Sequence, residues 1–264
     1  NTERFAALFR GLERAYGSLE ITNKDARTQK QKGQYLFVKE PRTTATFDAH
    51  LAGKQSIGVV PINEDNLCVW GAIDIDQYPL DHVALIRKVE KLELPLVVCR
   101  SKSAGAHVFL FLKDFVEAEA LQLKLKEIAA ELGYGGCEIF PKQIKLVVER
   151  GDNGNFLNLP YFDQKGGLRY ALKSDGSAAT LEEFLKYAEE SAIDVADLDP
   201  LLTQETPAVD DRLKDGPPCL QALLRQGFPE GTRNNGLFNL GVYLRKAYPD
   251  DWETRILDYN QTIM

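Results

Sequence analysis

Cys68-Val-Trp-Gly-Ala-Ile-Asp-Ile-Asp76 is the stretch that decides the fold of this 264-residue chain. It is an apolar run typical of a buried β-strand, and it ends in two aspartates spaced i, i+2. Side chains alternate between the two faces of a strand, so Asp74 and Asp76 share one face while Ile73 and Ile75 point the other way, into a core. Pro79 ends the strand, and we expect a helix to start near Leu80.

The spacing of the two aspartates suits a metal site. Two carboxylates on one face at a strand end can hold two divalent cations about 4 Å apart, an arrangement used for phosphoryl and nucleotidyl transfer. The spacing alone decides little, because Asp197-Leu198-Asp199 repeats it in an acidic, proline-flanked segment. Asp74 and Asp76 differ in having an apolar strand before them and a turn after them. The alternative is a pair of solvated aspartates at a strand-to-helix turn.

A second polar segment, Arg100-Ser-Lys-Ser-Ala-Gly-Ala-His107, lies between two predicted strands. Its small residues predict a turn in which Gly105 lets a ligand approach the backbone closely. The side chains around that glycine would form a cradle for an anionic phosphate chain. The alternative for a lone histidine at a strand edge is a surface side chain whose hydrogen bonds are satisfied and which has no functional role. The candidates in this segment, besides Gly105, are Arg100, Lys102, Ser103 and His107.

Together with three further segments, these motifs resemble the archaeo-eukaryotic primase superfamily. The resemblance is to the primase domain of TOTE conflict systems and to the primase-polymerases of phages and plasmids. TOTE-type members carry a cysteine cluster upstream of an H-L-x-G segment; this chain has none there, which favours a phage or plasmid relative. The three further segments are His50-Leu-Ala-Gly-Lys54, Glu138-Ile-Phe-Pro-Lys-Gln143 and Gly154-Asn-Phe-Leu-Asn-Leu-Pro160.

The resemblance implies a set of metal ligands. Asp74, Asp76 and Glu138 would be the catalytic carboxylates and would bind two Mg²⁺ or Mn²⁺ ions. One ion would activate the 3′-hydroxyl of a primer or first nucleotide, and the other would hold the departing pyrophosphate. The third acid is commonly Asp in the superfamily, so Glu149 and Asp152 stay open as alternatives to Glu138.

The resemblance also implies nucleotide contacts. Ser103 and His107 would contact the triphosphate of the incoming nucleotide. Lys142 could meet the triphosphate or the template, or could simply be solvated. Asn155 is unusual in an apolar strand and could line the nucleotide pocket, or could serve only the turn with the preceding glycine. Lys54 is a further candidate for contact with a nucleic-acid phosphate.

Composition limits the setting in which the chain works. It is 44% hydrophobic, has no apolar run near the ~20 residues of a membrane span, and shows no signal peptide. It has no phosphate-binding loop of the ATPase type, so any helicase domain or subunit lies outside it. The cysteines form no C-x-x-C pair and predict a reducing cytoplasm with no structural zinc. They are Cys68, Cys99, Cys137 and Cys219. The resemblance implies that the cell is a bacterial, archaeal or phage-infected one.

Charge is segregated along the chain, whose net charge is −7. Residues 24–54 are predominantly basic, and residues 182–215 are strongly acidic. The basic part predicts weak, salt-sensitive binding to a nucleic-acid backbone. The resemblance implies a single-stranded DNA template and NTP or dNTP as the partners, and no membrane is expected.

Periodicity predicts an α/β (α+β) chain, and the resemblance implies an RRM-like sheet. Apolar spacing predicts helices at Thr2–Tyr16, Leu80–Leu92, Glu117–Leu132 and Thr180–Ser191. Strands are predicted at Tyr35–Val38, Ser56–Ile62, Leu67–Asp74, Leu96–Arg100, Val108–Leu112 and Phe156–Phe162.

The C-terminal part differs from the rest in its composition and in its predicted secondary structure. A catalytic domain at 1–205 would be followed by an acidic linker at 206–216 and an all-helical module at 217–264, which could be truncated. Helices are predicted there at Cys219–Gln226, Asn234–Ala247 and Trp252–Ile263. The module resembles a primase C-terminal module that helps start primers, with nucleic-acid contacts at Arg233 and Asn234. The alternative is a small helical packing domain.

These observations predict a template-directed nucleotidyltransferase, a DNA primase or DNA polymerase that extends a primer or starts one de novo. Two alternatives stay open. One is a gap-filling repair polymerase of the same fold. The other is a non-catalytic module that binds nucleic acid or nucleotide within a larger complex.

Overall fold

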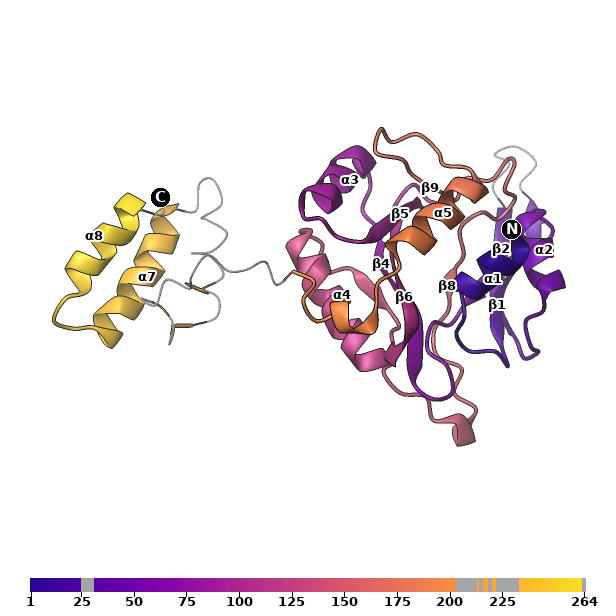
Figure 1. The fold of residues 1–264 in the computed structure, drawn as a ribbon, viewed down its shortest axis with the longest axis horizontal. Helices are drawn as coiled ribbons and strands as arrows, with labels where there is room; N and C mark the ends of the chain where they lie inside the picture. The colour runs from indigo at the N-terminus through magenta and orange to yellow at the C-terminus, as the bar shows by residue number, and fades with distance from the viewer. Residues whose placement is uncertain (25–30, 203–212, 214–215, 218–219, 222–232, 263–264) are drawn as a thin grey trace. The chain divides into compact units, whose positions relative to one another are not determined.

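The computed structural model describes most of the chain and divides it into two units, Asn1–Thr203 and Gln204–Met264, each of which is described by itself (Figure 1). The described residues are 1–24, 31–202, 213, 216–217, 220–221 and 233–262. No helix within these residues is both long enough and apolar enough to cross a membrane.

The first unit is built on a five-stranded sheet with the strand order β7-β4-β6-β5-β9, and every neighbouring pair is antiparallel. One helix joins β4 to β5 and another joins β6 to β7, which gives the β-α-β-β-α-β order expected of an RRM-like sheet. The predicted α+β fold class is confirmed. The elements are β4 (Leu67–Ile75), α3 (His82–Lys91), β5 (Leu96–Arg100), β6 (Ala106–Glu117), α4 (Ala118–Glu131), β7 (Glu138–Phe140) and β9 (Tyr170–Ala171).

A second, four-stranded antiparallel sheet has the order β2-β1-β3-β8. It lies with three helices on the side of the five-stranded sheet opposite α3 and α4 (Figure 1). Its strands are β1 (Tyr16–Lys24), β2 (Gln31–Val38), β3 (Ser56–Val59) and β8 (Leu157–Asn158). The helices are α1 (Thr2–Leu8), α2 (Thr44–Leu51) and α5 (Leu181–Ser191), and two short 3₁₀ helices are η1 (Val148–Arg150) and η2 (Val195–Asp197).

The alternation of side chains along β4 sends residues into two separate cores. Ile73 and Ile75 pack with the apolar faces of α3 and α4 in the first core. Trp70 and Ala72 point the other way, into a second core that contains the aromatic residues of α1 and α5. Each fully buried aromatic or aliphatic side chain contributes about 1.5–3 kcal/mol relative to exposure. Both faces of the sheet are therefore strongly specified.

The N-terminal helix is shorter than its periodicity predicts. The predicted helix Thr2–Tyr16 ends at Leu8, although the later apolar residues remain buried. After it the chain turns to run along β3, and the backbone N–H of Leu12 donates to the Val60 carbonyl. Gly11 permits this approach, because a Cβ there would lie 2.1 Å from the same carbonyl oxygen. The apolar residues spaced three and four positions apart are therefore buried here without forming a helix.

Other element predictions differ mainly in extent. The strand predicted at Phe156–Phe162 is reduced to β8, because the backbone pairs with β3 over only two residues. The strands β1 and β9 and the helix α2 were not predicted. The positions of the strands β4 and β5 and of the helices α3, α4 and α5 are confirmed.

In the described residues of the second unit the helices are α7 (Arg233–Ala247) and α8 (Trp252–Thr262), which confirm two of the predicted C-terminal helices. They pack around Leu240, Leu244 and Tyr259, all fully buried. The helix predicted at 219–226 and the linker predicted at 206–216 fall largely outside the described residues.

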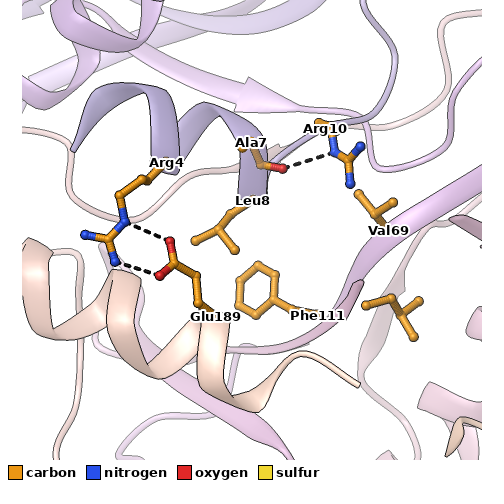
Figure 2. Close-up of a pocket in the computed structure, with 8 residues that line it drawn as sticks. Arg4, Ala7, Leu8, Arg10, Val69, Phe111 and Glu189 are labelled. Carbon is orange, nitrogen blue, oxygen red and sulfur yellow. Dashed lines mark hydrogen bonds and ion pairs between the residues drawn. The ribbon is translucent and has the colours of Figure 1, made fainter. Parts of the chain in front are cut away.

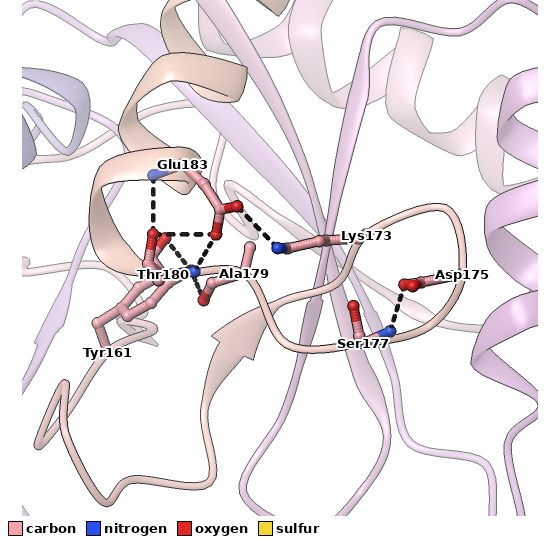
Figure 3. A network of polar contacts seen from close by, with 7 residues as sticks. All are labelled: Tyr161, Lys173, Asp175, Ser177, Ala179, Thr180 and Glu183. Atoms are coloured by element: carbon pink, nitrogen blue, oxygen red, sulfur yellow. Dashed lines mark hydrogen bonds and ion pairs between the residues drawn. The ribbon is translucent and has the colours of Figure 1, made fainter.

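A polar network joins α5 to the segment before it (Figure 3). Thr180 caps α5 by accepting from the Glu183 backbone, and Glu183 in return accepts from the Thr180 backbone. The carboxylate of Glu183 also pairs with Lys173 at 2.7 Å. The Tyr161 hydroxyl accepts from the Ala171 N–H at 3.1 Å and donates to the Ala179 carbonyl at 3.0 Å. The edge strand β9 is thereby tied to α5.

His50, the first residue of the H-L-x-G-like segment, is a buried structural link. Its Nδ1 accepts from the Ile57 N–H at 3.1 Å, so its proton is on Nε2, which donates to the Pro160 carbonyl at 2.8 Å. Burial lowers the pKa of His50 to about 4, and the charge of Arg169 acts in the same direction, against the hydrogen bond to Pro160. The neutral ring joins α2, β3 and the segment after β8.

We expect this histidine to make the fold sensitive to acid. The pKa of His50 lies below its unfolded value of about 6.5, so the unfolded chain binds the proton first. The stabilisation is present above pH 6.5 and is lost as the pH falls towards 4, by on the order of 3 kcal/mol. Urea unfolding of the wild type and of His50→Gln at pH 7, 5.5 and 4.5 measures it. A stability gap between the two proteins that does not shrink in acid would contradict it.

Candidate active site

Strand register brings the three best sequence candidates together. Asp74 in β4 is paired with His107 in β6 on one side and with Glu138 in β7 on the other. Directly paired residues of antiparallel strands point to the same face, so the three side chains form one row across the sheet. Asp76 follows two residues later on that face, just beyond the end of β4. Further along the strands, this face is the floor of the second core.

Asp74 is the ionisable group of the row whose charged form is least favoured by its surroundings. Its side chain is 15% exposed, and its Oδ1 is buried without a hydrogen bond, 3.4 Å from His107 Nε2. The pKa of Asp74 is raised to about 7, chiefly by burial and then by the charges of Asp76 and Glu138, against the opposing effect of Lys142. A buried carboxylate without a partner is costly and is an attractive site for a cation.

His107 is buried and neutral at pH 7. Burial lowers its pKa to about 4, and the positive charge of Arg169 contributes in the same direction. Asp76 and a hydrogen bond with the backbone of Asn158 act in the opposite direction without restoring the charge. Because Asn158 belongs to β8, the contact connects the row to the second sheet. The histidine is thus a fixed neutral imidazole beside an anionic group.

Glu138 is the acid that the fold places beside Asp74. It is exposed and pairs with Lys142 at 2.6 Å, while Lys142 lies 5.1 Å from the ring centroid of Phe140. Of the two alternatives, Glu149 is an exposed residue of η1, and Asp152 Oδ1 accepts from the Gly154 N–H. Neither of them is paired with β4. The candidate third ligand and the candidate phosphate lysine therefore neutralise each other.

The turn between β5 and β6 presents the phosphate-binding candidates. The Ser101 N–H donates to the Gly105 carbonyl at 2.9 Å and closes the turn, with Lys102 and Ser103 exposed at its tip. Gly105 serves the sheet itself, since a Cβ there would lie 2.2 Å from the Ile75 carbonyl oxygen. The glycine allows the close approach of strand β4, and the free side chains of the turn face solvent.

Two other nucleotide candidates already have protein partners. Arg100 donates to the Leu168 carbonyl at 2.7 Å and lies 5.9 Å from the ring centroid of Tyr170. The Asn155 N–H donates to Gln143 Oε1 at 2.9 Å, and the Gln143 side-chain amide donates back to Asn155 Oδ1. Both residues hold loops in place around the row.

The nucleic-acid candidates do not belong to the strands that form the row. Lys54 is exposed in the turn after α2, where Gly53 has φ +73° and packs against Asp163. Arg233 and Asn234 begin α7 in the second unit, and their side chains lie outside the described part of the structure.

Sequence reasoning missed two residues beside the row. Arg169 is buried and donates to the Leu159 carbonyl and to Ser56 Oγ, and nothing in the sequence distinguishes it from a surface arginine. Cys137 was expected to be a buried apolar residue like Cys68 and Cys99, but it is partly exposed. Burial is the main cause that raises the pKa of the Cys137 thiol, and the charges of Asp74 and Asp76 act in the same direction. A hydrogen bond from the Asp76 backbone acts in the opposite direction.

The donor set fits a divalent cation in its chemistry. Carboxylate oxygens are the ligands that Mg²⁺ and Mn²⁺ prefer, and Asp74 Oδ1 is a buried oxygen without a partner. Among the described residues, no three His, Cys, Asp or Glu side chains are already gathered closely enough to hold a metal. Asp74 and Asp76 are the available pair, and Glu138 would have to leave Lys142 to join them.

A separate surface pocket lies between α1, α5 and the five-stranded sheet (Figure 2). A bidentate ion pair between Arg4 and Glu189 borders an apolar floor that includes Leu8 and Phe111. None of the candidate catalytic or nucleotide-binding side chains lines this pocket. The candidate active site is thus defined by the row of polar side chains and not by a cavity.

Comparison with known proteins gives the family. Residues 13–183 match the family model described as TOTE conflict system, Archaeo-Eukaryotic Primase domain, so the chain belongs to this family. The expected resemblance to the archaeo-eukaryotic primases is confirmed, and the missing cysteine cluster does not exclude the TOTE type. Membership places the chain among the primase-type nucleotidyltransferases. No curated protein is similar to it in sequence.

Solved structures of primases are also similar to the chain. The archaeo-eukaryotic primase domain of the cyanophage S-2L primase-polymerase is 12% identical, with a TM-score of 0.37, over 70% of this chain and 94% of that one. The catalytic domain of primase RepB′, in complex with initiator DNA, is 15% identical, with a TM-score of 0.34, over 72% and 90%. A second structure of RepB′ is 14% identical, with a TM-score of 0.34, over 100% and 93%.

The close approach at Gly105 gives a stability test. We expect Gly105→Ala to destabilise the protein by about 2 kcal/mol or more, since the new Cβ would collide with backbone that cannot move without breaking strand pairing. Gly136→Ala is the matched control, because nothing lies within 4 Å of a Cβ at that position. Thermal unfolding of both variants measures the difference. Equal melting temperatures would show that the turn tolerates a side chain and that the strands are less tightly joined.

Proposed function

We propose that the chain is a metal-dependent, template-directed nucleotidyltransferase that extends a primer and starts one de novo. The observation that carries this proposal is the row of Glu138, Asp74 and His107 across three paired strands, with Asp76 beside it. This row combines an unsatisfied buried carboxylate with a neutral histidine next to an exposed turn of small and basic residues. Nucleotidyl transfer needs these elements: oxygen ligands for cations and donors for a triphosphate.

The residues divide by chemistry into two groups. Asp74 and Asp76 would hold two Mg²⁺ or Mn²⁺ ions, which supply positive charge to the attacking hydroxyl and to the departing pyrophosphate. His107 would lie beside the triphosphate, where its burial keeps the ring in one position. It could donate to the phosphate only as the imidazolium, because the single N–H of the neutral ring is bonded to the backbone of Asn158. Ser103 and Lys102 reach the same anion from the turn. Because strand pairing sets the positions of Asp74 and His107 before substrate binds, little reorganisation of these two residues is needed during the reaction.

Glu138 and Lys142 form an exchangeable pair in this scheme. At rest, the lysine neutralises the glutamate at 2.6 Å on an exposed surface, where an ion pair is worth about 0–1 kcal/mol. Separating them is therefore inexpensive. Glu138 would then complete the carboxylate set, and Lys142 would be released towards the triphosphate.

The second unit would assist initiation. Starting a chain requires a template and two nucleotides to be held without the affinity that a primer lends, which favours an additional binding surface. The exposed residues Arg245 and Lys246 in the last turn of α7 could contact a phosphate backbone. We propose a catalytic domain at 1–205 and a helical module at 217–264 with this division of work.

Carboxylate substitution tests the catalytic proposal. We expect Asp74→Asn and Asp76→Asn each to reduce nucleotide incorporation on a primed template by at least about a thousandfold, because losing a metal removes several kcal/mol of transition-state stabilisation. The measurement is primer extension with Mg²⁺ or Mn²⁺ and with NTPs and dNTPs supplied separately.

Asp197→Asn is the matched control, since Asp197 belongs to the second Asp-x-Asp sequence, which is remote from the row. It should leave incorporation unchanged. Incorporation that survives in the Asp74→Asn, Asp76→Asn double variant would overturn the proposal. Triphosphate binding without incorporation in the wild type would identify a binding module, and activity confined to gapped duplexes would identify a repair polymerase.

The role of the second unit can be tested in the full chain. We expect Arg245→Ala with Lys246→Ala to lower de novo primer synthesis several-fold while extension of an existing primer is largely retained, since only initiation depends on the extra phosphate contacts. Truncation after Thr206 should have the same effect more strongly. Primer synthesis and primer extension are measured on the same single-stranded DNA.

The control removes one arginine and one lysine elsewhere. Arg87→Ala with Lys91→Ala takes the same charges from the exposed side of α3, in the first unit. This variant should initiate as the wild type does. A truncated protein that starts primers as well as the full chain would limit the second unit to packing or tethering.

A further inference from the structure

Tyr78 has no assigned role, yet its side chain contacts a candidate metal ligand. It lies in the segment that follows β4, two residues after Asp76, and is 54% exposed. Its hydroxyl donates to Asp76 Oδ1 at 2.8 Å.

The bond to Asp76 has consequences for a cation. Asp76 is exposed, and a solvated carboxylate at a strand end samples several rotamers. A hydrogen bond to a charged acceptor is stronger than one between neutral groups, and it favours one of these rotamers. With Oδ1 occupied by the tyrosine, Oδ2 remains for a metal. Hydrogen bonds that orient ligating carboxylates typically alter metal affinity by 10–100-fold.

We propose that Tyr78 is a positioning residue: its hydroxyl orients Asp76 for divalent-cation binding. This inference rests on the proposed function, since it assumes that Asp76 is a metal ligand. This role also accounts for an exposed aromatic side chain beside the end of β4. The ring packs in neither core, and the structure of the sheet does not depend on it.

Direct metal binding provides the test. Free Mn²⁺ is followed by its electron paramagnetic resonance signal as the wild-type full chain, Tyr78→Phe and Tyr187→Phe are titrated. Phenylalanine keeps the ring and removes only the hydroxyl. Tyr187 is a partly exposed tyrosine of α5, away from the row, and serves as the matched control. We expect about tenfold weaker Mn²⁺ binding in Tyr78→Phe and no change in Tyr187→Phe.

A second measurement separates orientation from damage to the fold. In primer extension, the Mn²⁺ concentration for half-maximal rate should rise in Tyr78→Phe by about the same factor as the binding constant. Saturating metal should then restore most of the rate. A structural defect would instead lower the rate at all metal concentrations and lower the melting temperature.

The outcomes distinguish this inference from the proposed function. If wild-type Mn²⁺ binding is not weakened by Asp74→Asn or Asp76→Asn, the metal site itself is refuted. If it is weakened by both, but Tyr78→Phe binds Mn²⁺ as the wild type does, only the role of Tyr78 is refuted. A change seen in Tyr78→Ala but not in Tyr78→Phe would assign the effect to the ring and also refute the role of the hydroxyl.

Discussion

The pairing register of β4 is the constraint on which the rest of the structure depends. The strand alternates Ile73, Asp74 and Ile75, and the two isoleucines are fixed by the core beneath α3 and α4. A slip of one residue against β6 or β7 would turn every side chain of β4 to the opposite face. Asp74 would then enter an apolar core without a partner, at a cost of several kcal/mol. Burial of the isoleucines therefore sets the position of the carboxylate.

The same register concentrates electrostatic cost at one end of the sheet. Asp74 has an orphaned oxygen, His107 is held neutral against its usual pKa, and the buried Arg169 lies close enough to influence that histidine. None of these arrangements favours folding by itself. The aromatic core around Trp70 and Phe184 lies on the same face and supplies the compensating apolar burial. Local conflict of this kind is expected where a fold carries a reactive site.

The sequence predicts the elements that have a strong, uninterrupted apolar pattern. The strand β5 and the helix α4 were placed closely, because β5 is a continuous buried run and α4 buries residues at a regular helical spacing. The N-terminal helix was overextended because burial at Leu12 is achieved by a non-helical backbone along β3. The two residues of β8 were overestimated as a longer strand, since polar and apolar residues there serve loop contacts instead of a ladder.

The candidate site was predictable to the extent that it is local. Asp74, Asp76 and His107 follow from two local segments, and the resemblance to a family brought in Glu138. Arg169 was not predictable, because its influence on His107 arises from packing between segments that are distant in the chain. For the same reason the sequence did not show that Arg100 and Asn155 have protein partners in other loops, and their ligand contacts stay predictions. Long-range pairing is the information that a single sequence does not contain.

Several motif residues are explained by the fold alone. His50 is bonded to Pro160, and Gln143 to Asn155, so the H-L-x-G, F-P-x-Q and G-N segments hold one another. Gly105 is required where the turn meets β4. Such residues build the frame and would be needed even in a protein without activity.

The remaining motif residues have no comparable structural purpose. Asp74 Oδ1 lacks a hydrogen bond, and Lys102 and Ser103 are exposed at the tip of a turn that closes through its backbone. Stability would be served as well or better by uncharged side chains at the position of Asp74. A group that the fold tolerates at a cost and does not use is best explained by a ligand. The argument for function is therefore strongest at these residues, where the structural explanation ends.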